Sequence, residues 1–371
     1  MKWVFWASVS VIAWTYLGYP LWLYVRSRWH ARPVRTAPME PSVSIIMAVH
    51  NEAEALPRKL RNLSEIDYPS DRYEIIVTSD GSTDGTNQIL AAQACDRLHA
   101  MESPWHQGKA CAISLAIKAA KGEILVLTDA RQLIAPDAVR RLVANFADPA
   151  VGCVSGELIL GQPVKTESGN GVGLYWRMEK KIRQWESVTG SVVGATGALY
   201  AVRRELAVPL PPGTLLDDVY LPLHVVCQAK RVVFEPGARA YDAAAAPRQE
   251  FRRKVRTLTG NYQLLRLAPW LLTRANPVRF EFVCHKLLRL LVPFALAGML
   301  LSSALLPGMF YALASLVQLV FYGSAALSVF RSRLGMVSRL ADVSLAFLVM
   351  NMAAAVAFIY FVTGKRKVWV R

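Results

Sequence analysis

Long hydrophobic runs lie near both ends of the chain, and a finer alternation of hydrophobic and polar residues lies between them. Residues 3–25 form an uncharged run that is long enough to cross a bilayer, and an arginine-rich stretch follows at 26–35. A cleaved signal peptide has a shorter hydrophobic core and a cleavage site of small residues, so we interpret this run as a retained anchor. Further runs at about 287–306, 309–330 and 340–363 predict three more membrane spans.

The basic residues beside the spans predict an orientation. Basic flanks prefer the cytoplasmic side, so the residues after the first run are expected in the cytoplasm. Four spans would then place the C-terminal tail outside, although Lys365, Arg366 and Lys367 favour the cytoplasm. A re-entrant segment or a tail that breaks the rule would explain this conflict, and both alternatives stay open. We expect a multi-pass protein of the inner (plasma) membrane with a cytoplasmic catalytic domain.

Between about 36 and 245 the pattern changes to short apolar segments that alternate with amphipathic ones. Buried strands are predicted at 42–49, 73–80 and 123–130. Helices are predicted at 53–66, from Asp84 or Thr86 to about 97, at 108–120 and at 135–146. Strands that are apolar on both faces and alternate with helices are typical of an α/β protein with a mainly parallel, doubly wound sheet.

A polar cluster follows each of the three predicted strands. The clusters are HNEAE at 50–54, SDGSTDG at 79–85 and TDAR at 128–131. In doubly wound sheets, ligands bind beyond the carboxyl ends of the strands, so the three clusters predict one site. The second cluster imitates the start of a calcium-binding EF-hand loop, but Ala91 stands where that loop needs a glutamate, which excludes such a site.

The polar clusters lack the two best-known phosphate-binding patterns. No G-x-G-x-x-G follows the first strand, and G-x-x-x-x-G-K-[ST] is absent from the chain. Carboxylates at a nucleotide site can instead accept hydrogen bonds from base and ribose, or hold a divalent cation beside a diphosphate.

Composition narrows the classes of function. The chain has a formal net charge of +16 and is 53% hydrophobic. Much of the positive charge lies beside the apolar runs, where lipid headgroups account for it, so we expect membrane lipids and no nucleic acid as partners. A transporter or scaffold is conceivable, but few polar residues interrupt the runs and no proton relay is visible. The five cysteines lack metal-type spacing and are expected to be reduced in a cytoplasmic domain.

Several segments together resemble a known family. They are SIIMAVHNEAE (44–54), IIVTSDGSTDGT (75–86), GKACAIS (108–114), VLTDA (126–130), TGALYAVRR (196–204) and LLDDVYLP (215–222). In this order and spacing, the first four resemble the nucleotide-sugar-binding half of family 2 glycosyltransferases, and the last two resemble the acceptor-side half. The flanking apolar runs suggest the membrane-embedded branch of cellulose, hyaluronan and poly-N-acetylglucosamine synthases.

The resemblance implies a fold and a domain organisation. The fold class is α/β, with a Rossmann-like A-type glycosyltransferase domain, a mostly parallel sheet, amphipathic interface helices and transmembrane helices. We expect an N-terminal anchor at 1–35, the cytoplasmic glycosyltransferase domain at 36–248, interface helices at 249–285 and a membrane region of about three segments at 286–371.

The resemblance assigns five residues to nucleotide-sugar binding. Asp80 matches the aspartate that bonds the uracil and ribose of a UDP-sugar, and a turn that caps the next helix is the alternative. Asn51 and Glu52 match the family's N-E pair, with Glu52 at the nucleoside. Lys109 matches a basic residue near the base or diphosphate, and a solvated lysine at the start of a helix is the alternative. Asp84 either joins this site or only caps the following helix.

Asp129 stands where the family carries the first aspartate of a D-x-D motif, which supports the sugar or diphosphate. The second, metal-binding carboxylate is replaced by Arg131. Arg131 could pair with phosphate directly through its bidentate guanidinium. The departing UDP still needs its charge neutralised, so the expected cofactor is Mg²⁺ or Mn²⁺ held through Asp129.

Asp217 and Asp218 match the acidic pair that carries the chemistry in the family. The second acid of that pair is the general base, which removes the proton of the acceptor hydroxyl during an inverting displacement. A neighbouring carboxylate raises the pKa of such a base towards working pH. The alternative, which does not exclude the first, is a helix N-terminus, where acidic residues are favoured.

Residues 250–265 combine an apolar stripe at helical spacing with basic residues on the other faces. This pattern predicts an amphipathic helix beside anionic headgroups. In the processive synthases a Q-x-x-R-W motif occupies this place, so Arg256 matches its diphosphate-contacting arginine and Arg253 stands in place of the glutamine. Thr257 replaces the tryptophan at the acceptor end, which favours few transfers over a processive synthase.

These residues together predict an inverting membrane glycosyltransferase. It would move a sugar from a UDP-sugar to a hydroxyl of a lipid-linked or polysaccharide acceptor at the cytoplasmic face. Two alternatives stay open: a processive synthase that extrudes a β-linked polymer, and a catalytically degraded relative that only binds nucleotide sugars. The need for a partner protein is also open.

Overall fold

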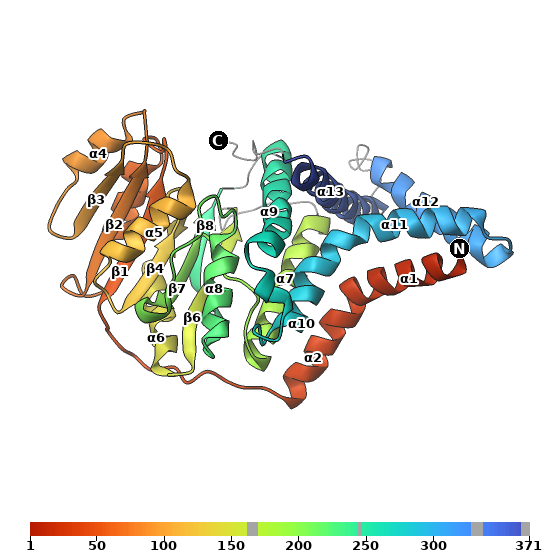
Figure 1. The fold of residues 1–371 in the computed structure, drawn as a ribbon, viewed down its shortest axis with the longest axis horizontal. Coiled ribbons are helices and arrows are strands. Elements are labelled where there is room, and N and C mark those ends of the chain that lie inside the picture. The colour runs from red at the N-terminus through yellow and green to blue at the C-terminus, as the bar shows by residue number, and fades with distance from the viewer. Residues whose placement is uncertain (162–169, 244–246, 328–336, 365–371) are drawn as a thin grey trace.

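The protein consists of an α/β domain, a group of long apolar helices, and helices that lie between the two (Figure 1). The computed structural model describes residues 1–161, 170–243, 247–327 and 337–364. The basic tail residues Lys365, Arg366 and Lys367 lie outside the described residues, so the conflict over their side of the membrane stays a sequence-based question.

Among the described residues, one mixed sheet of eight strands forms the centre of the α/β domain, in the order β3-β2-β1-β4-β7-β6-β8-β5. The strands are β1 (Val43–Val49), β2 (Tyr73–Asp80), β3 (Leu98–Ser103), β4 (Ile124–Thr128), β5 (Leu133–Ile134), β6 (Val151–Leu160), β7 (Leu199–Arg203) and β8 (Arg231–Asp242). Strands β7 and β5 are antiparallel to their neighbours, and the other strands share one direction. The predicted α/β fold class is confirmed, with a parallel half and a mixed half.

The three predicted strands correspond to β1, β2 and β4. Their side chains point alternately into two hydrophobic clusters on opposite faces of the sheet. Ile45 and Val77 lie in one cluster, and Ile46 and Ile76 lie in the other. Because both faces are covered, these strands appear in the sequence as continuous apolar runs.

Helices cover both faces of the sheet. The cluster that contains Ile45 also takes side chains from α3 (Leu56–Ser64), α4 (Thr86–Ala92) and α6 (Ala138–Ala144). The cluster that contains Ile46 takes them from α5 (Lys109–Ala119) and α8 (Asp217–Cys227). The predicted helices are present but shorter than expected, since α3 begins at Leu56 and α6 at Ala138.

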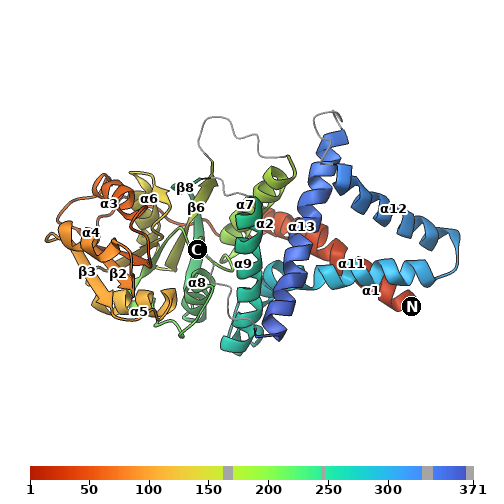
Figure 2. The same ribbon diagram turned by 90° about the horizontal axis from the view of Figure 1, so that it is seen from above.

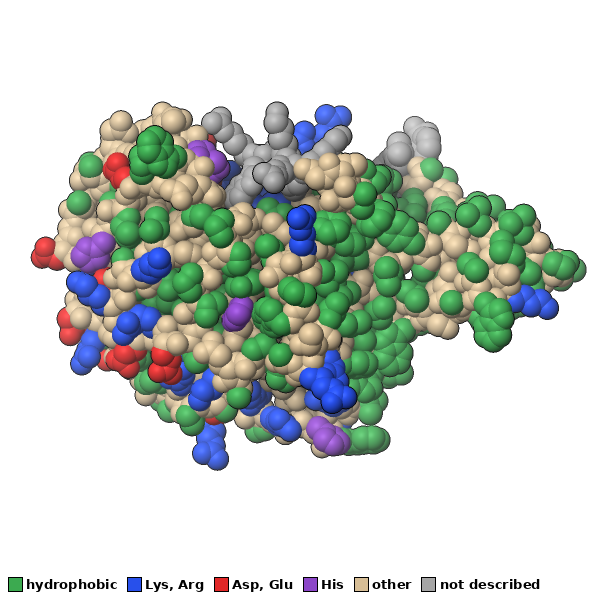
Figure 3. Space-filling model, in the orientation of Figure 1, with side chains coloured by type: hydrophobic (Ala, Val, Ile, Leu, Met, Phe, Trp, Pro, Cys, Tyr) green, Lys and Arg blue, Asp and Glu red, His purple; other side chains and the backbone are tan. Residues whose placement is uncertain are grey.

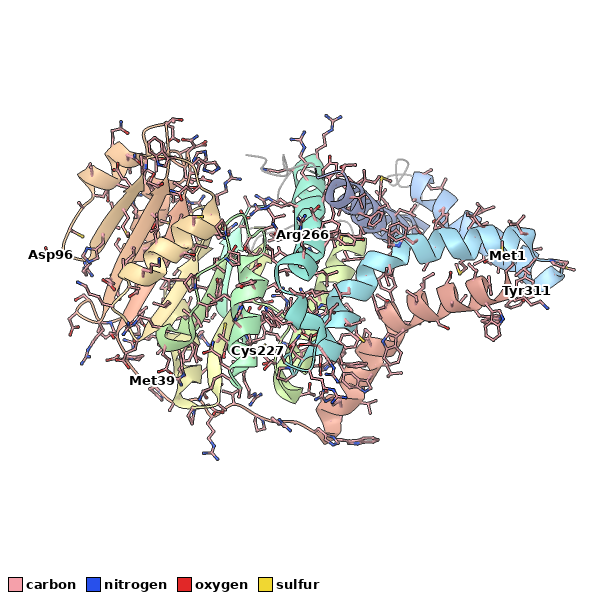
Figure 4. All side chains as sticks on the ribbon, in the orientation of Figure 1. Met1, Met39, Asp96, Cys227, Arg266 and Tyr311 are labelled. Atoms are coloured by element: carbon pink, nitrogen blue, oxygen red, sulfur yellow. The ribbon has the colours of Figure 1, made fainter. Side chains whose placement is uncertain are left out.

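Four helices in the described part of the chain are long and apolar enough to cross a membrane, as predicted. They are Lys2–Trp29, Arg279–Leu305, Met309–Ala326 and Ala341–Val362. They comprise α1 (Lys2–Ala13) with α2 (Tyr19–Trp29), α10 (Arg279–Phe282) with α11 (Leu288–Leu305), α12 (Met309–Ala326) and most of α13 (Val337–Val362). In Figure 3, charged side chains gather over the α/β domain, and the projecting helices are largely hydrophobic. Figure 4 places Met1 and Tyr311 together at their far end.

Helices α7 (Asn170–Thr189) and α9 (Pro247–Leu267) lie between the sheet and the apolar helices (Figure 2). The amphipathic helix predicted at 250–265 is present as α9, but its apolar stripe has a protein partner. Val255 and Tyr262 pack with Ala353 and Ala357 of α13. This part of the stripe therefore joins the α/β domain to a candidate span and does not face headgroups as expected.

Candidate active site

The loops after β1 and β2 are joined by hydrogen bonds between the two predicted polar clusters. The Asn51 backbone adopts a left-handed conformation with φ of 53°, which asparagine tolerates well. The Asn51 side-chain oxygen accepts a hydrogen bond from the Thr83 amide at 2.7 Å, and the Asn51 amide donates to the Ser82 hydroxyl at 3.1 Å. Asn51 thus holds the two loops together at the carboxyl edge of the sheet.

Asp84 caps the helix that follows it, which was the alternative to a direct role in the site. Its carboxylate accepts hydrogen bonds from the Thr86 amide at 3.0 Å and from the Ala53 amide at 3.1 Å. The first bond satisfies a free amide at the start of α4, and the second ties that helix to the loop after β1. Asp84 therefore supports the edge of the site.

Asp80 is almost fully buried and fixes the loop that precedes α5. Its carboxylate accepts hydrogen bonds from the amides of Gln107 at 2.8 Å and Gly108 at 2.7 Å, and it lies 2.8 Å from the His106 ring nitrogen. A side chain at Gly81 would meet the His106 backbone at 2.5 Å, so only glycine permits this close approach of the two loops. Asp80 thereby sets the position of Lys109, the first residue of α5.

Lys109 connects the end of β4 with the start of α8. Its ammonium group lies 2.9 Å from the Asp129 carboxylate and 3.3 Å from the Asp217 carboxylate. Burial alone would lower the pKa of Lys109, but Asp129 and Asp217 outweigh it and raise this pKa above its ordinary value. Lys109 is therefore a fixed positive charge between two of the predicted site residues.

The N-terminal end of α8 faces the same side as the carboxyl ends of the parallel strands. Figure 4 labels Met39, just before β1, and Cys227, the last residue of α8, both in the lower half of the view. The end of β1 and the start of α8 therefore both face the upper side. Asp217 and Asp218, the first residues of α8, join the site from there.

Asp218 is held in a fixed orientation and has a raised pKa. Its carboxylate accepts a hydrogen bond from the Gly197 amide at 3.1 Å, which fixes its orientation. Burial and the adjacent Asp217 raise the pKa of Asp218 to about 6, against the lowering effect of Lys109. Such a group is ionised at neutral pH and remains basic enough to accept a proton.

Two of the predicted arginines, Arg131 and Arg253, form ion pairs beside the site. Arg131 lies 3.3 Å from the Glu52 carboxylate, so these two residues form one ion pair after β1 and β4. Arg253 of α9 lies 3.3 Å from Asp242, which also accepts a hydrogen bond from Gln132 at 2.8 Å. Arg253 is thus linked to the loop after β4, and Arg256 lies three residues further along α9.

Lys59 is a buried residue beneath the site that the sequence did not reveal. Its ammonium group donates to the Thr128 hydroxyl at 2.8 Å and to the Gln132 carbonyl at 2.6 Å, directly on either side of the Asp129 loop. In the sequence it appeared as an ordinary basic residue of an amphipathic helix. Burial lowers its pKa to about 7, although Asp129 partly opposes this effect.

The lowered pKa of Lys59 predicts a pH-dependent free energy of unfolding. The unfolded lysine titrates near pH 10.4, so between about 7 and 10.4 the unfolded chain binds more protons than the folded one, and stability rises with pH. The slope from this group is at most about 1.4 kcal/mol per pH unit. We expect the melting temperature of the detergent-solubilised protein to rise from pH 7 to pH 9 more steeply for the wild type than for Lys59→Met. The exposed neighbour variant Arg58→Met should keep the wild-type slope, and equal slopes for Lys59→Met and wild type would contradict this prediction.

Parts of the chain are similar to known proteins. The model of the family described as glycosyl transferase family 2 matches residues 44–208. A beta-monoglucosyldiacylglycerol synthase from Nostoc sp. is 33% identical over 118 residues, which cover 31% of this chain and 25% of that protein. An N-acetylglucosaminyltransferase from Sinorhizobium fredii is 27% identical over 263 residues, which cover 64% of this chain and 63% of that protein. The matches thus span from a quarter to just under two thirds of these relatives.

A solved structure shares the whole architecture. A mannosyltransferase from Pyrobaculum calidifontis, in complex with GDP-Man and Mn²⁺, superposes with a TM-score of 0.72 and 24% identity, over 97% of this chain and 99% of the other. This likeness supports the fold, including the apolar helices. Residues 44–208 therefore match the family 2 glycosyltransferase model, and four helices in the described part of the chain are long and apolar enough to cross a membrane.

Proposed function

We propose that the protein is an inverting glycosyltransferase of the inner membrane, which moves a sugar from a UDP-sugar to a hydroxyl of a lipid-linked or polysaccharide acceptor at the cytoplasmic face. The observation that carries this proposal is the arrangement around Lys109. It holds Asp129, from the donor half, and Asp217, from the acceptor half, within 3.3 Å of one ammonium group. A donor diphosphate near Asp129 and an acceptor hydroxyl near Asp218 would then be neighbours.

Each site residue has a separate role in the proposed sugar transfer. The Asp218 carboxylate takes the proton of the acceptor hydroxyl as the hydroxyl oxygen bonds to the anomeric carbon of the sugar. The bond from that carbon to the diphosphate breaks, and UDP leaves with the electron pair. Lys109 holds a positive charge beside Asp129, where negative charge develops on the departing diphosphate. Asn51, Glu52 and Asp80 shape and line the nucleoside end.

The site residues fit a divalent cation that takes one ligand from the protein and other ligands from the phosphates of the donor. Among the described residues, no three His, Cys, Asp or Glu side chains are grouped to hold a metal by themselves. Mg²⁺, however, is commonly bound by one or two carboxylates together with substrate phosphates. Asp129 is 36% exposed, and Lys109 engages one of its oxygens, so the other is available. When bound, the cation would supply neutralisation of the diphosphate charge.

The proposal is tested by UDP release from purified protein in lipid nanodiscs, with a panel of UDP-sugars and membrane lipid extract. We expect release with one UDP-sugar, loss of release with EDTA, and recovery with Mg²⁺ or Mn²⁺. Asp129→Asn should require more metal for the same rate, and the exposed control Asp137→Asn should not. Release from a GDP-sugar alone would contradict the UDP assignment. UDP binding without any turnover would favour the catalytically degraded alternative.

The masses of the products distinguish the addition of one or a few sugars from the synthesis of a polymer. The Q-x-x-R-W motif of the processive synthases is altered at Arg253 and Thr257. Arg253 forms an ion pair with Asp242. We therefore expect one or a few sugars to be added to the acceptor. A ladder of evenly spaced masses would show a processive synthase instead.

A further inference from the structure

Residues 195–197 hold Asp218 at two points, and we call them the base-holding segment. The Ala195 amide donates a hydrogen bond to the Asp218 carbonyl at 2.7 Å. The Gly197 amide donates to the Asp218 carboxylate at 3.1 Å. A side chain at Gly197 would meet this carboxylate at 3.1 Å, so the carboxylate lies close against the backbone of the segment. The position of the carboxylate therefore depends on the position of this segment.

Thr196, the middle residue of the base-holding segment, is held from two sides. Its amide donates a hydrogen bond at 2.9 Å to the hydroxyl of Ser155, a fully buried residue of β6. Its hydroxyl accepts a hydrogen bond at 2.5 Å from the guanidinium of Arg183 in α7. The first bond fixes the segment to the sheet, and the second fixes it to the helix that lies between the sheet and the apolar helices (Figure 2).

Arg183 is itself oriented by Glu179, which lies one turn earlier in α7. The Arg183 guanidinium lies 3.6 Å from the Glu179 carboxylate. The same carboxylate accepts a hydrogen bond from Arg289 at 2.8 Å and lies 3.1 Å from the His285 ring nitrogen. Arg289 and His285 belong to the candidate span Arg279–Leu305. A continuous series of contacts thus connects this span, through Glu179 and Arg183, with the base-holding segment.

The guanidinium of Arg183 suits the task of fixing Thr196. A hydrogen bond with a charged donor is roughly twice as strong as one between neutral groups. The side chains of Arg183 and Glu179 are 20% and 10% exposed, so water competes little for their contacts. Arginine also carries several donors in one rigid plane, so it can hold Thr196 while it contacts Glu179. Arg183 therefore favours one position of Thr196, and hence one position of the adjacent Gly197 amide.

We propose that Arg183 is a positioning residue, which acts through Thr196 to hold the base-holding segment where the Gly197 amide orients the Asp218 carboxylate for proton transfer. This inference rests on the proposed function, since it needs Asp218 to be the base, and it adds a residue to which that reaction gives no role. Arg183 neither takes nor gives a proton. Because Glu179 contacts a candidate span, the orientation of the base also depends on how that span packs beside α7.

UDP release in nanodiscs, measured for variants at both ends of the bond from Arg183 to Thr196, tests the proposal. We expect Arg183→Met to lower kcat by about 10- to 100-fold, since a displacement of about 1 Å near the reacting atoms can cost roughly 10²-fold. The KM for the UDP-sugar should stay within about twofold. Thr196→Val should lower kcat by a similar factor, because it keeps the arginine and removes only the hydroxyl that accepts its hydrogen bond.

Three further variants distinguish positioning from general support of the fold. Thr196→Ser keeps the hydroxyl and should restore most of the kcat that Thr196→Val loses. The double variant of Arg183→Met with Thr196→Val should lose no more than the worse single variant, because both changes break the same hydrogen bond. Arg177→Met removes an exposed arginine of the same helix and should leave kcat unchanged. Thermal unfolding of each variant checks that the fold persists.

Three results would overturn the proposal. The losses in kcat could multiply in the double variant, which would show that the two residues act independently. Thr196→Val could keep the wild-type kcat, which would show that Arg183 does not act through this hydroxyl. Arg183→Met could raise the KM for the UDP-sugar at unchanged kcat, which would make Arg183 a donor-binding residue.

Asp218→Asn, measured on the same preparations, separates this inference from the proposed function. If Asp218→Asn loses the rate while Arg183→Met or Thr196→Val keeps it, the inference alone is overturned. Wild-type protein that releases no UDP, or an Asp218→Asn variant that keeps the wild-type rate, would reject the proposed function itself.

Discussion

Replacing Asp218 by asparagine is expected to lower kcat by about 10²- to 10⁴-fold, the usual contribution of a general base. Asparagine keeps an oxygen that can accept the Gly197 amide hydrogen, now 3.1 Å from the carboxylate, so the fold and the donor site should persist. UDP release in nanodiscs measures the loss, and UDP titration checks that donor binding stays within about twofold. Asp71→Asn, which removes a carboxylate that is 80% exposed, is the control.

The pH dependence of the wild-type rate provides an independent check of the same role. The raised pKa of Asp218, about 6, means that the base is ionised above this pH and protonated below it. Activity should therefore fall as pH decreases through about 6. An Asp218→Asn variant that keeps more than a tenth of the wild-type rate would contradict the assignment.

Replacing Lys109 by methionine is expected to have the second largest effect. The ammonium group lies 2.9 Å from Asp129 and 3.3 Å from Asp217, and its removal leaves two carboxylates without their shared counter-charge. Asp217, whose side chain is 6% exposed, would lose its nearby counter-charge, which destabilises the fold. We expect a lower melting temperature and weaker UDP-sugar binding, measured by thermal unfolding and by titration.

The same substitution should move the pH profile in a defined direction. Lys109 lowers the pKa of Asp218, so its removal raises that pKa and shifts the acid limb of activity to higher pH. Lys118→Met, on the exposed side of α5, should leave the limb in place. An unchanged or downward-shifted limb in Lys109→Met would show that Lys109 does not act on the base.

The sequence allowed the first half of the fold to be predicted because its strands are buried on both faces. Strands β1, β2 and β4 appear as uninterrupted apolar runs, and each ends in a recognisable polar cluster. Strand β3 was missed because its residues His99 and Ala100 are exposed at the edge of the sheet, so it has no such run. The reversed direction of β7 follows from long-range pairing with β4 and has no local signal.

The sequence revealed the candidate site residues that lie at the ends of strands or the beginnings of helices. It did not reveal the residue that reaches the site only through packing between elements. Asp80, Lys109, Asp129, Asp217 and Asp218 all stand at ends of strands or beginnings of helices, where periodic patterns break. Lys59 lies inside helix α3. Its contacts depend on which strand ends that helix covers, and the face of an amphipathic helix does not identify its partner in the sequence. For the same reason, α9 was correctly predicted as a helix while its packing against α13 was not.

The most direct test of the account is the anomeric configuration of the sugar in the isolated product, determined by NMR after transfer from an α-linked UDP-sugar in nanodiscs. Attack by an acceptor oxygen that Asp218 deprotonates, on the face opposite the departing UDP, predicts a β-linked product. A product linked in the α configuration would contradict direct displacement and the role of Asp218 as its base.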